Sequence, residues 1–262
     1  SRLGRALVER RHAALGIVFP GLSGPYYSEV IAGFEDEAVK ARVAVLILGT
    51  HLLHASHDLV LDMADRVDGL AVMGGVLSDE IVRRLDDRGD PVVLLASRPL
   101  PGIATVRTEN VASMARLTTH LLSEHGYERL AFVGDPEGSP DTTYRWQGFL
   151  QAHARCGVEP PAEPVRVGLA QSDGYIAVSR LLEAGKAPRA IVCANDETAL
   201  GAVIALLDKG IRVPQDVAVT GFDDVPMAGL PASGLTTVHQ PTRELGSHTA
   251  QFLLRRIEGR TE

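Results

Sequence analysis

Short apolar runs alternate with amphipathic helical patterns along almost the whole chain, and the stretch 191–240 shows this most clearly. An apolar run there ends at Asn195. The segment Thr198–Lys209 then places four apolar side chains on one helical face, namely Leu200, Val203, Ile204 and Leu207. A second apolar run follows and ends in Asp223 and Asp224. The order strand, helix, strand is typical of a parallel α/β unit.

The same alternation predicts two such units in the chain. In the first, the predicted strands are Ala14–Phe19, Val43–Leu48, Gly69–Met73 and Pro91–Ala96, and the predicted helices are Tyr26–Arg42, Ser56–Val67 and Ser78–Arg88. A crossing segment near Ile103–Glu109 follows. In the second, the predicted strands are Leu130–Gly134, Pro164–Val167, Ala190–Ala194 and Val217–Phe222, and the predicted helices are Asn110–His125, Tyr144–Cys156, Asp173–Ala184 and Glu197–Lys209. The segment Leu235–Gln240 then leads to a last amphipathic helix, Thr242–Ile257.

Polar side chains follow two of the predicted strands in the second unit. Ligands of open parallel sheets bind outside the carboxyl ends of the strands. Asn195 and Asp223 stand at two such ends, where an amide and a carboxylate can together bind vicinal hydroxyls. N-capping is the competing role, because Asn and Asp favour helix starts; we expect Asp196 to be the cap and Asp224 to be structural. This edge holds no nucleophile, which favours binding of a small polar molecule.

Composition limits the class of protein. The chain has 262 residues, of which 45% are hydrophobic and 23% charged, and its mean hydropathy is +0.06, as in ordinary soluble globular proteins. No apolar stretch approaches the roughly 20 residues of a membrane helix, and the start of the chain lacks the apolar segment of a secretory signal. The net charge of −7 argues against the chain binding DNA by itself. Cys156 and Cys193 are expected to be two inert thiols in a reducing cytoplasm.

Several segments resemble one known family, in the order in which they occur. The segments ANDETALG, VPQDVAVTGFDD and LTTVHQP closely resemble the effector-binding domain of the LacI/GalR (lactose-repressor-like) transcriptional regulators. The resemblance continues upstream through LGIVFPGLSGPYYSEVIAGFE, RVDGLAVM and YRWQGF. It implies an α/β fold of two similar, doubly wound parallel-sheet lobes joined by three crossings, as in type I periplasmic binding proteins. It assigns residues 13–106 and 238–258 to the N-terminal lobe, 107–237 to the C-terminal lobe, 1–12 to a hinge remnant and 259–262 to a tail.

The resemblance also implies effector contacts in the first lobe. Tyr26 and Tyr27 match positions where the family often places aromatic rings against the ligand, and the C–H faces of a sugar stack well on such rings. Packing of one tyrosine into the core is the alternative. Ser97 falls at a cleft position where many relatives have an acid.

Three further cleft positions are implied in the second lobe. Arg145 matches an arginine that points into the cleft and binds ligand oxygens, for which its planar fork is suited. The alternative is a surface arginine that pairs with Asp141 along the helix. Asp141 itself matches a polar cleft position. Leu169 falls where relatives have an aromatic residue, so this position, like Ser97, leaves the identity of the effector open.

Motifs for metal binding and catalysis are weak or absent. His51, His54 and His57 are spaced three apart, which could seat zinc or nickel, but the family has a polar loop here. The sequence contains no GxGxxG, GxxxxGK[ST], GxSxG or HExxH pattern. We therefore predict no metal, no cofactor and no enzymatic activity.

The resemblance implies the cytoplasmic effector-sensing domain of a DNA-binding transcriptional regulator, in the first instance a repressor. A small polar effector, most often a sugar in this family, is expected between the lobes, so that closure changes operator affinity. A homodimer is expected, with its interface on the helices that start near Tyr26 and near Ser56–Ser78, and with operator DNA held by an N-terminal helix-turn-helix that this sequence lacks. The alternative is an exported solute-binding protein of a sugar transporter, which has the same fold. An enzyme on this scaffold is a third possibility.

Overall fold

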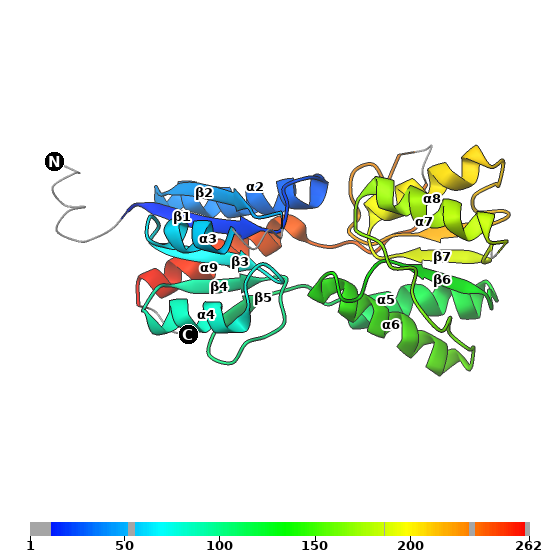
Figure 1. Cartoon of the computed structure of the whole chain (residues 1–262), viewed down its shortest axis with the longest axis horizontal. Helices are drawn as coiled ribbons and strands as arrows, with labels where there is room; N and C mark the ends of the chain where they lie inside the picture. Colours follow the sequence, from blue (N-terminus) through cyan, green and yellow to red (C-terminus); the bar gives the residue numbers. More distant parts are fainter. Residues whose placement is uncertain (1–11, 52–55, 186, 231–233, 260–262) are drawn as a thin grey trace. The chain divides into compact units, whose positions relative to one another are not determined.

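The computed structural model describes residues 12–51, 56–185, 187–230 and 234–259 (Figure 1). Internal contacts divide the chain into two compact units. Unit 1 comprises Ser1–Thr108 and Pro241–Glu262, and unit 2 comprises Glu109–Gln240. The chain thus passes from unit 1 to unit 2 after Thr108 and returns after Gln240, which are two of the three crossings that the resemblance implies.

Unit 1 contains a parallel sheet of five strands in the order β2-β1-β3-β4-β5. The strands are β1 (Ala14–Phe19), β2 (Ala44–Gly49), β3 (Gly69–Met73), β4 (Val92–Leu95) and β5 (Ala104–Val106). Its helices are α2 (Pro25–Ala41), α3 (Ser56–Ala64), α4 (Asp79–Asp87) and α9 (Thr242–Ile257). Ile17 of β1 pairs with Ile47 of β2 and Ala71 of β3, which fixes the register on both sides of β1.

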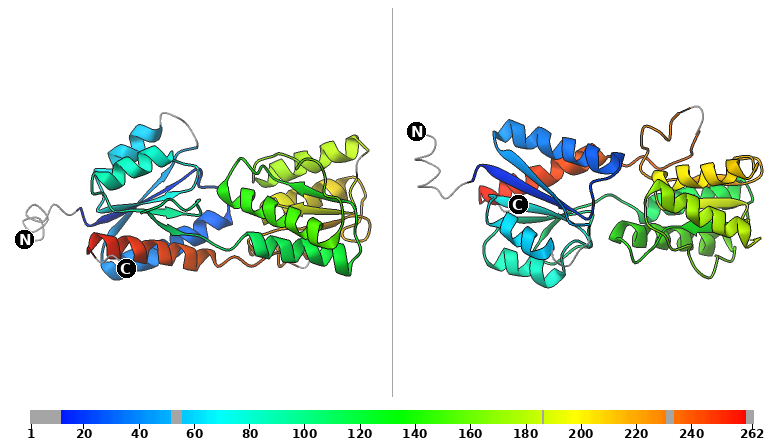
Figure 2. Two further views of the ribbon diagram at one scale, coloured as in Figure 1. Left: turned by 90° about the horizontal axis from the view of Figure 1, so that it is seen from below. Right: turned by 45° about the horizontal axis from the view of Figure 1, so that its top comes forward.

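Alternate side chains of β1 serve two separate cores, because successive residues of a strand point to opposite faces of the sheet. Leu15, Ile17 and Phe19 pack against α2 and α9, whereas Ala14 and Val18 pack against α3 and α4. The left view of Figure 2 shows α9, in red, on the opposite side of the sheet from α3 and α4. Helix α9, which is late in the sequence, therefore completes the core that α2 begins.

Unit 2 contains a parallel sheet in the order β6-β7-β8. Its strands are β6 (Leu130–Val133), β7 (Ala190–Cys193) and β8 (Ala218–Thr220), and its helices are α5 (Val111–Thr119), the π-helical turn η1 (His120–Glu124), α6 (Pro140–Cys156), α7 (Gln171–Glu183) and α8 (Asp196–Asp208). Helices α5 and α6 cover one face of the sheet and α7 and α8 cover the other (Figure 1). Both units are thus doubly wound parallel α/β structures, as the alternation of patterns predicts.

Several predicted elements differ from the structure, including the predicted strand Val217–Phe222, of which only Ala218–Thr220 forms β8, and the predicted helix Ser56–Val67, which ends at Ala64. Residues Ala104–Val106 form a short edge strand instead of a mere crossing segment. The predicted strand Pro164–Val167 makes only one bridge, Val133 with Val165, since a proline cannot donate to a strand ladder. Helix α6 starts a turn earlier than predicted, because Ser139 caps it by accepting a hydrogen bond from the Thr142 amide at 3.2 Å. The predicted helix Asn110–His125 is an α-helix that ends in a π-helical turn.

Two predictions from composition can be compared with the structure. Cys156 and Cys193 are free thiols, as expected. Cys193 lies in buried strand β7, and burial raises the pKa of its thiol. Among the helices that the structure describes, none is long and apolar enough to cross a membrane.

Candidate functional site

A buried arginine lies at the carboxyl edge of the unit 2 sheet. Arg145, in the second turn of α6, is only 4% exposed. Its Nη1 donates to the carbonyl of Ala194 just after β7 at 2.7 Å, and its Nε donates to Oδ1 of Asn110 at 2.8 Å. The guanidinium also stacks on the ring of Phe222, with Cζ 3.9 Å from the ring centroid. Arg145 is therefore fixed inside unit 2 and is not the surface arginine of the alternative interpretation.

Two carboxylates lie beside this guanidinium, and we define the arginine cluster as Arg145, Asp141, Asp223, Asn110 and Gln240. Nη2 of Arg145 lies 3.4 Å from Oδ1 of Asp223 and 3.9 Å from Oδ2 of Asp141. The two amides join the group, since Asn110 Nδ2 donates to Asp141 at 3.0 Å and Gln240 Nε2 donates to Asp223 at 3.0 Å. The segments that supply these residues are far apart in the sequence but meet at one edge of the sheet.

The carboxyl group of Asp223 has a strongly raised pKa. Burial of its carboxyl group raises the pKa to about 7; Arg145 lowers the pKa, whereas the negative charges of Asp196, Asp141 and Glu197 raise it. The backbone is unusual here as well, because Asp223 and Asp224 have φ values of 116° and 59°. Such values are rare for residues other than glycine and are often found at functional sites. The adjacent bridge from Asp223 to His239 holds this conformation in place.

Asn195 caps helix α8, a role that the sequence analysis assigned to Asp196. It is the N-cap of α8, where its Oδ1 accepts a hydrogen bond from the Thr198 amide at 3.0 Å. Its Nδ2 donates to the carbonyl of Leu169 at 3.0 Å, so both ends of the amide are engaged. The expectation that Asp196 is the cap is wrong. The Asp196 carboxylate instead accepts from the Val225 amide at 2.9 Å and holds the loop that follows β8.

Leu169 and Asp224 have supporting positions in unit 2. The side chain of Leu169 is partly buried and packs against the core between the sheet and α5 and α6. Its carbonyl oxygen, rather than its side chain, contacts Asn195. The carboxylate of Asp224 contacts Nδ1 of His239 at 2.9 Å, in line with the expected structural role.

The three predicted effector residues of unit 1 lie at the carboxyl edge of its own sheet. Tyr26 and Tyr27 begin α2, and their rings meet edge to face at 5.5 Å. Tyr27 also meets Phe19 at the end of β1 at 5.5 Å, so both tyrosines are half-buried against the core. Ser97 follows β4 and is partly buried. Each tyrosine ring therefore packs partly against the core, as the alternative interpretation proposed.

The histidine group predicted as a weak metal site cannot be assessed as a whole, because His54 lies outside the described residues. The hinge segment 1–12 also lies outside them, except for His12. Across the ranges that are described, no group of three or more His, Cys, Asp and Glu side chains is placed to hold a metal ion.

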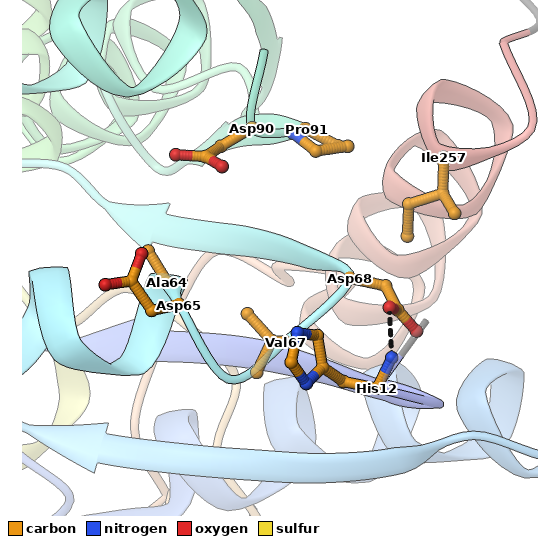
Figure 3. Close-up of a pocket in the computed structure, with 8 residues that line it drawn as sticks. All are labelled: His12, Ala64, Asp65, Val67, Asp68, Asp90, Pro91 and Ile257. Carbon is orange, nitrogen blue, oxygen red and sulfur yellow. Dashed lines mark hydrogen bonds between the residues drawn. The ribbon is translucent and has the colours of Figure 1, made fainter. Parts of the chain in front are cut away.

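A cavity of about 360 Å³ in unit 1 lies away from these edges (Figure 3). It opens near the amino ends of β1, β3 and β4, and Asp65, Asp68 and Asp90 line it. These acids already have partners, since Asp68 accepts from the His12 amide at 2.6 Å, and Arg88 binds Asp65 at 2.9 Å and Asp90 at 2.6 Å. We therefore do not assign the effector to this cavity.

Comparison with known proteins identifies the family. Residues 119–262 match the family model of the periplasmic binding protein-like domain. The HTH-type transcriptional repressor CytR of Escherichia coli (strain K12) is 28% identical to this chain, over 98% of this chain and 76% of the relative. This chain belongs to the LacI/GalR family. The resemblance that its motifs carry is thereby confirmed, together with the fold class.

Two solved transcriptional regulators that are similar to this chain contain a bound sugar. The complex of the transcriptional regulator CelR with cellobiose has a TM-score of 0.85 and 26% identity, and the match covers 99% of this chain and 84% of that one. A LacI family regulator from Enterococcus faecium with bound ribose has a TM-score of 0.84 and 25% identity, with 94% and 90% covered. Regulators of this family bind small-molecule effectors and operator DNA.

Sequence reasoning missed two members of the arginine cluster. Asn110 was predicted only as the start of a helix, and Gln240 only as part of the LTTVHQP motif. Both are 3% exposed, and a buried amide requires partners. The available signal was their place at the two ends of unit 2, where the chain enters and leaves it.

Proposed function

We propose that this chain is the effector-sensing domain of a transcriptional repressor and that the arginine cluster binds hydroxyl groups of a small polar effector, most simply a sugar. The observation that carries the proposal is the contact of buried Arg145 with buried Asp223 and partly buried Asp141 at the carboxyl edge of a parallel sheet. Burial of charged side chains lowers the stability of the fold, because the charges lose their hydration.

The geometry of Arg145 supports a ligand at this point. Its Nη2 stands 3.4 Å from Asp223 and 3.9 Å from Asp141, and both distances exceed the roughly 2.7–2.9 Å of a charge-assisted hydrogen bond. Nη2 also donates to Oε1 of Gln240, but at the long distance of 3.5 Å. Because none of these contacts is short, a ligand oxygen can compete for Nη2, while the two carboxylates can accept from ligand hydroxyls. Donor and acceptor side by side match the dual character of a sugar hydroxyl.

The proposal extends to unit 1 and to the whole regulator. Tyr26, Tyr27 and Ser97 would face the effector from the other lobe, and Leu169 and Asn195 would support the loops around it. Closure of the lobes on the effector would shift a homodimer between states of different operator affinity. Operator DNA would be bound by a helix-turn-helix, as the description of CytR as HTH-type suggests. We place this non-enzymatic protein in the cytoplasm.

Calorimetric titration tests the site directly. Cellobiose and ribose are the first ligands, followed by a panel of neutral mono- and disaccharides. Replacing Asp223 with asparagine should weaken binding at least 10-fold, because it removes an acceptor for ligand hydroxyls. Asp208→Asn is the matched control, since Asp208 ends α8 and accepts from Tyr175 at 3.0 Å. Equal affinity in the wild type and in Asp223→Asn would reject the assignment of the site.

A further inference from the structure

A single π-helical turn at the end of α5 brings two histidine side chains together in unit 2. The backbone amide of His125 donates to the carbonyl of His120 five residues earlier, at 3.4 Å. This wider turn places Nε2 of His120 and Nε2 of His125 only 3.1 Å apart, with ring centroids separated by 4.7 Å. Single π-helical turns of this kind occur often at functional sites.

The two separations suit a metal ion better than a direct hydrogen bond. Two nitrogens that each lie about 2.05 Å from one metal ion are about 2.9–3.4 Å apart for ligand angles of about 90–109°. The observed 3.1 Å falls within this range. A straight N–H···N bond of that length would instead hold the ring centroids about 5.4 Å apart. The observed 4.7 Å is shorter, as expected where both nitrogens converge on a common point.

Neighbouring side chains hold both rings in this arrangement. The Glu124 carboxylate contacts Nδ1 of His120 at 3.0 Å. A proton on Nδ1 leaves Nε2 with a free lone pair, as in the carboxylate–histidine–metal arrangement. The ring of His125 stacks on Tyr127 at 5.2 Å with planes 19° apart, and Tyr127 lies under the guanidinium of Arg189 at 4.2 Å. Each histidine is therefore oriented by a second residue.

We propose that His120 and His125 form a binding site for a divalent transition metal ion, namely Ni²⁺, Cu²⁺ or Zn²⁺. Imidazole nitrogens are suitable ligands for these ions, and Glu124 acts as the orienting residue. Both rings reach the surface, so water completes the coordination. The absence of a third protein ligand among the described residues makes this a site of modest affinity.

This site is separate from the arginine cluster. Asn110 of the cluster immediately precedes the first residue of α5, whereas His120 immediately follows its last residue. The helix of nine residues is about 13 Å long, so a metal ion at the π-helical turn does not touch the proposed effector. The inference therefore does not rest on the proposed function.

Calorimetric titration with Ni²⁺ tests the site in protein without a histidine tag. His51, His54 and His57 are first replaced with alanine, which removes the rival histidine group. In this background we expect one ion per chain. The affinity should fall at least about 10-fold in His120→Ala and in His125→Ala, and about 10-fold in Glu124→Gln, in which the orienting carboxylate is lost.

His248→Ala is the matched control, because His248 is exposed on α9 and its Nδ1 lies 3.4 Å from Oε1 of Gln251, which is not a histidine. It should bind Ni²⁺ as the parent does. In His125→Asn the same metal ligand is replaced with a polar side chain, which should weaken Ni²⁺ binding as His125→Ala does. Thermal unfolding checks that each variant is folded. Failure of the parent to bind Ni²⁺, or equal affinity in His120→Ala and the parent, would overturn the proposal.

The ligand atoms provide an independent readout. In ¹⁵N spectra of the imidazole rings, Zn²⁺ should shift the Nε2 signals of His120 and His125 and leave the Nδ1 signal of His120 as a protonated nitrogen. Signals that shift at Nδ1 instead would contradict the geometry. Sugar binding should be unchanged by the ion, which separates this test from that of the effector site.

Discussion

Replacement of Asp223 with asparagine should remove a pH dependence from the stability of unit 2. The carboxyl group is buried beside Arg145, and burial raises its pKa to about 7, against about 3.9 in an unfolded chain. Between these two values the folded protein binds a proton that the unfolded chain has released. The carboxyl group therefore stabilises the fold fully below the unfolded pKa, and this contribution is lost as the pH rises through about 7.

The size of the effect follows from the two pKa values. For a folded pKa of about 7 and an unfolded pKa of about 3.9, the contribution to the free energy of unfolding falls by about 1.4 kcal/mol between pH 6 and pH 8.5. Between pH 5 and pH 8.5 the loss is about 2.7 kcal/mol. Asparagine has a similar shape but does not titrate. The difference in stability between the variant and the wild type should change with pH by these amounts.

Urea unfolding followed by tryptophan fluorescence measures this difference. Trp146 is the only tryptophan, and it stacks on Phe149 inside unit 2 at 5.3 Å, so its signal reports that unit. Burial also raises the pKa values of Asp196 and Glu197, but both residues are present in both proteins, so most of their effect cancels in the difference. Parallel pH profiles for the wild type and Asp223→Asn would refute the reasoning.

Three further substitutions test the packing of unit 2 by the same fluorescence assay. Arg145→Ala leaves the buried carboxylate of Asp223 and the partly buried carboxylate of Asp141 without their cation and should cost about 3–5 kcal/mol; a loss below about 1 kcal/mol would contradict the buried pairing. Asn195→Ala removes the helix cap and the hydrogen bond to the Leu169 carbonyl and should cost about 1–2 kcal/mol; an unchanged stability would contradict the capping role. In Gly201→Ala the new Cβ would lie 1.9 Å from the carbonyl oxygen of Gln171, which should cost about 1–3 kcal/mol. Gly229→Ala should cost little, because its Cβ would make only an ordinary contact with the Pro226 carbonyl oxygen at 3.9 Å.

Elements with a strong apolar pattern could be predicted with their limits. The strands Ala14–Phe19 and Gly69–Met73 and the helix Thr242–Ile257 occur in the structure as predicted. Both strands are buried on two faces, and the helix carries a continuous apolar stripe. The edge strand Ala104–Val106 has only three residues and is only partly buried, so its short sequence carries no clear pattern. Pairing with β4 decides its conformation.

The candidate site could be predicted only in part. The family motifs indicated Arg145, Asp141 and Asp223, and the structure brings these three together. Sequence alone did not assign the helix cap correctly, because this depends on the strand ending at Cys193, one residue earlier than predicted. Asn195 then falls at the cap, and its carboxylate neighbour turns toward the loop after β8. A shift of one residue thus exchanges the roles of two adjacent side chains.

The charges of the arginine cluster favour a neutral effector over an anionic one. One guanidinium faces two carboxylates, so the buried group carries a net negative charge whenever Asp223 is ionised. A phosphate or carboxylate on the ligand would approach these acids in a medium of low polarity, at a cost that a single arginine does not offset. Hydroxyls, in contrast, can donate to the carboxylates and accept from Arg145. Ribose should therefore bind more tightly than ribose 5-phosphate in calorimetric titration at pH 8, and the reverse order would contradict this assignment of charge.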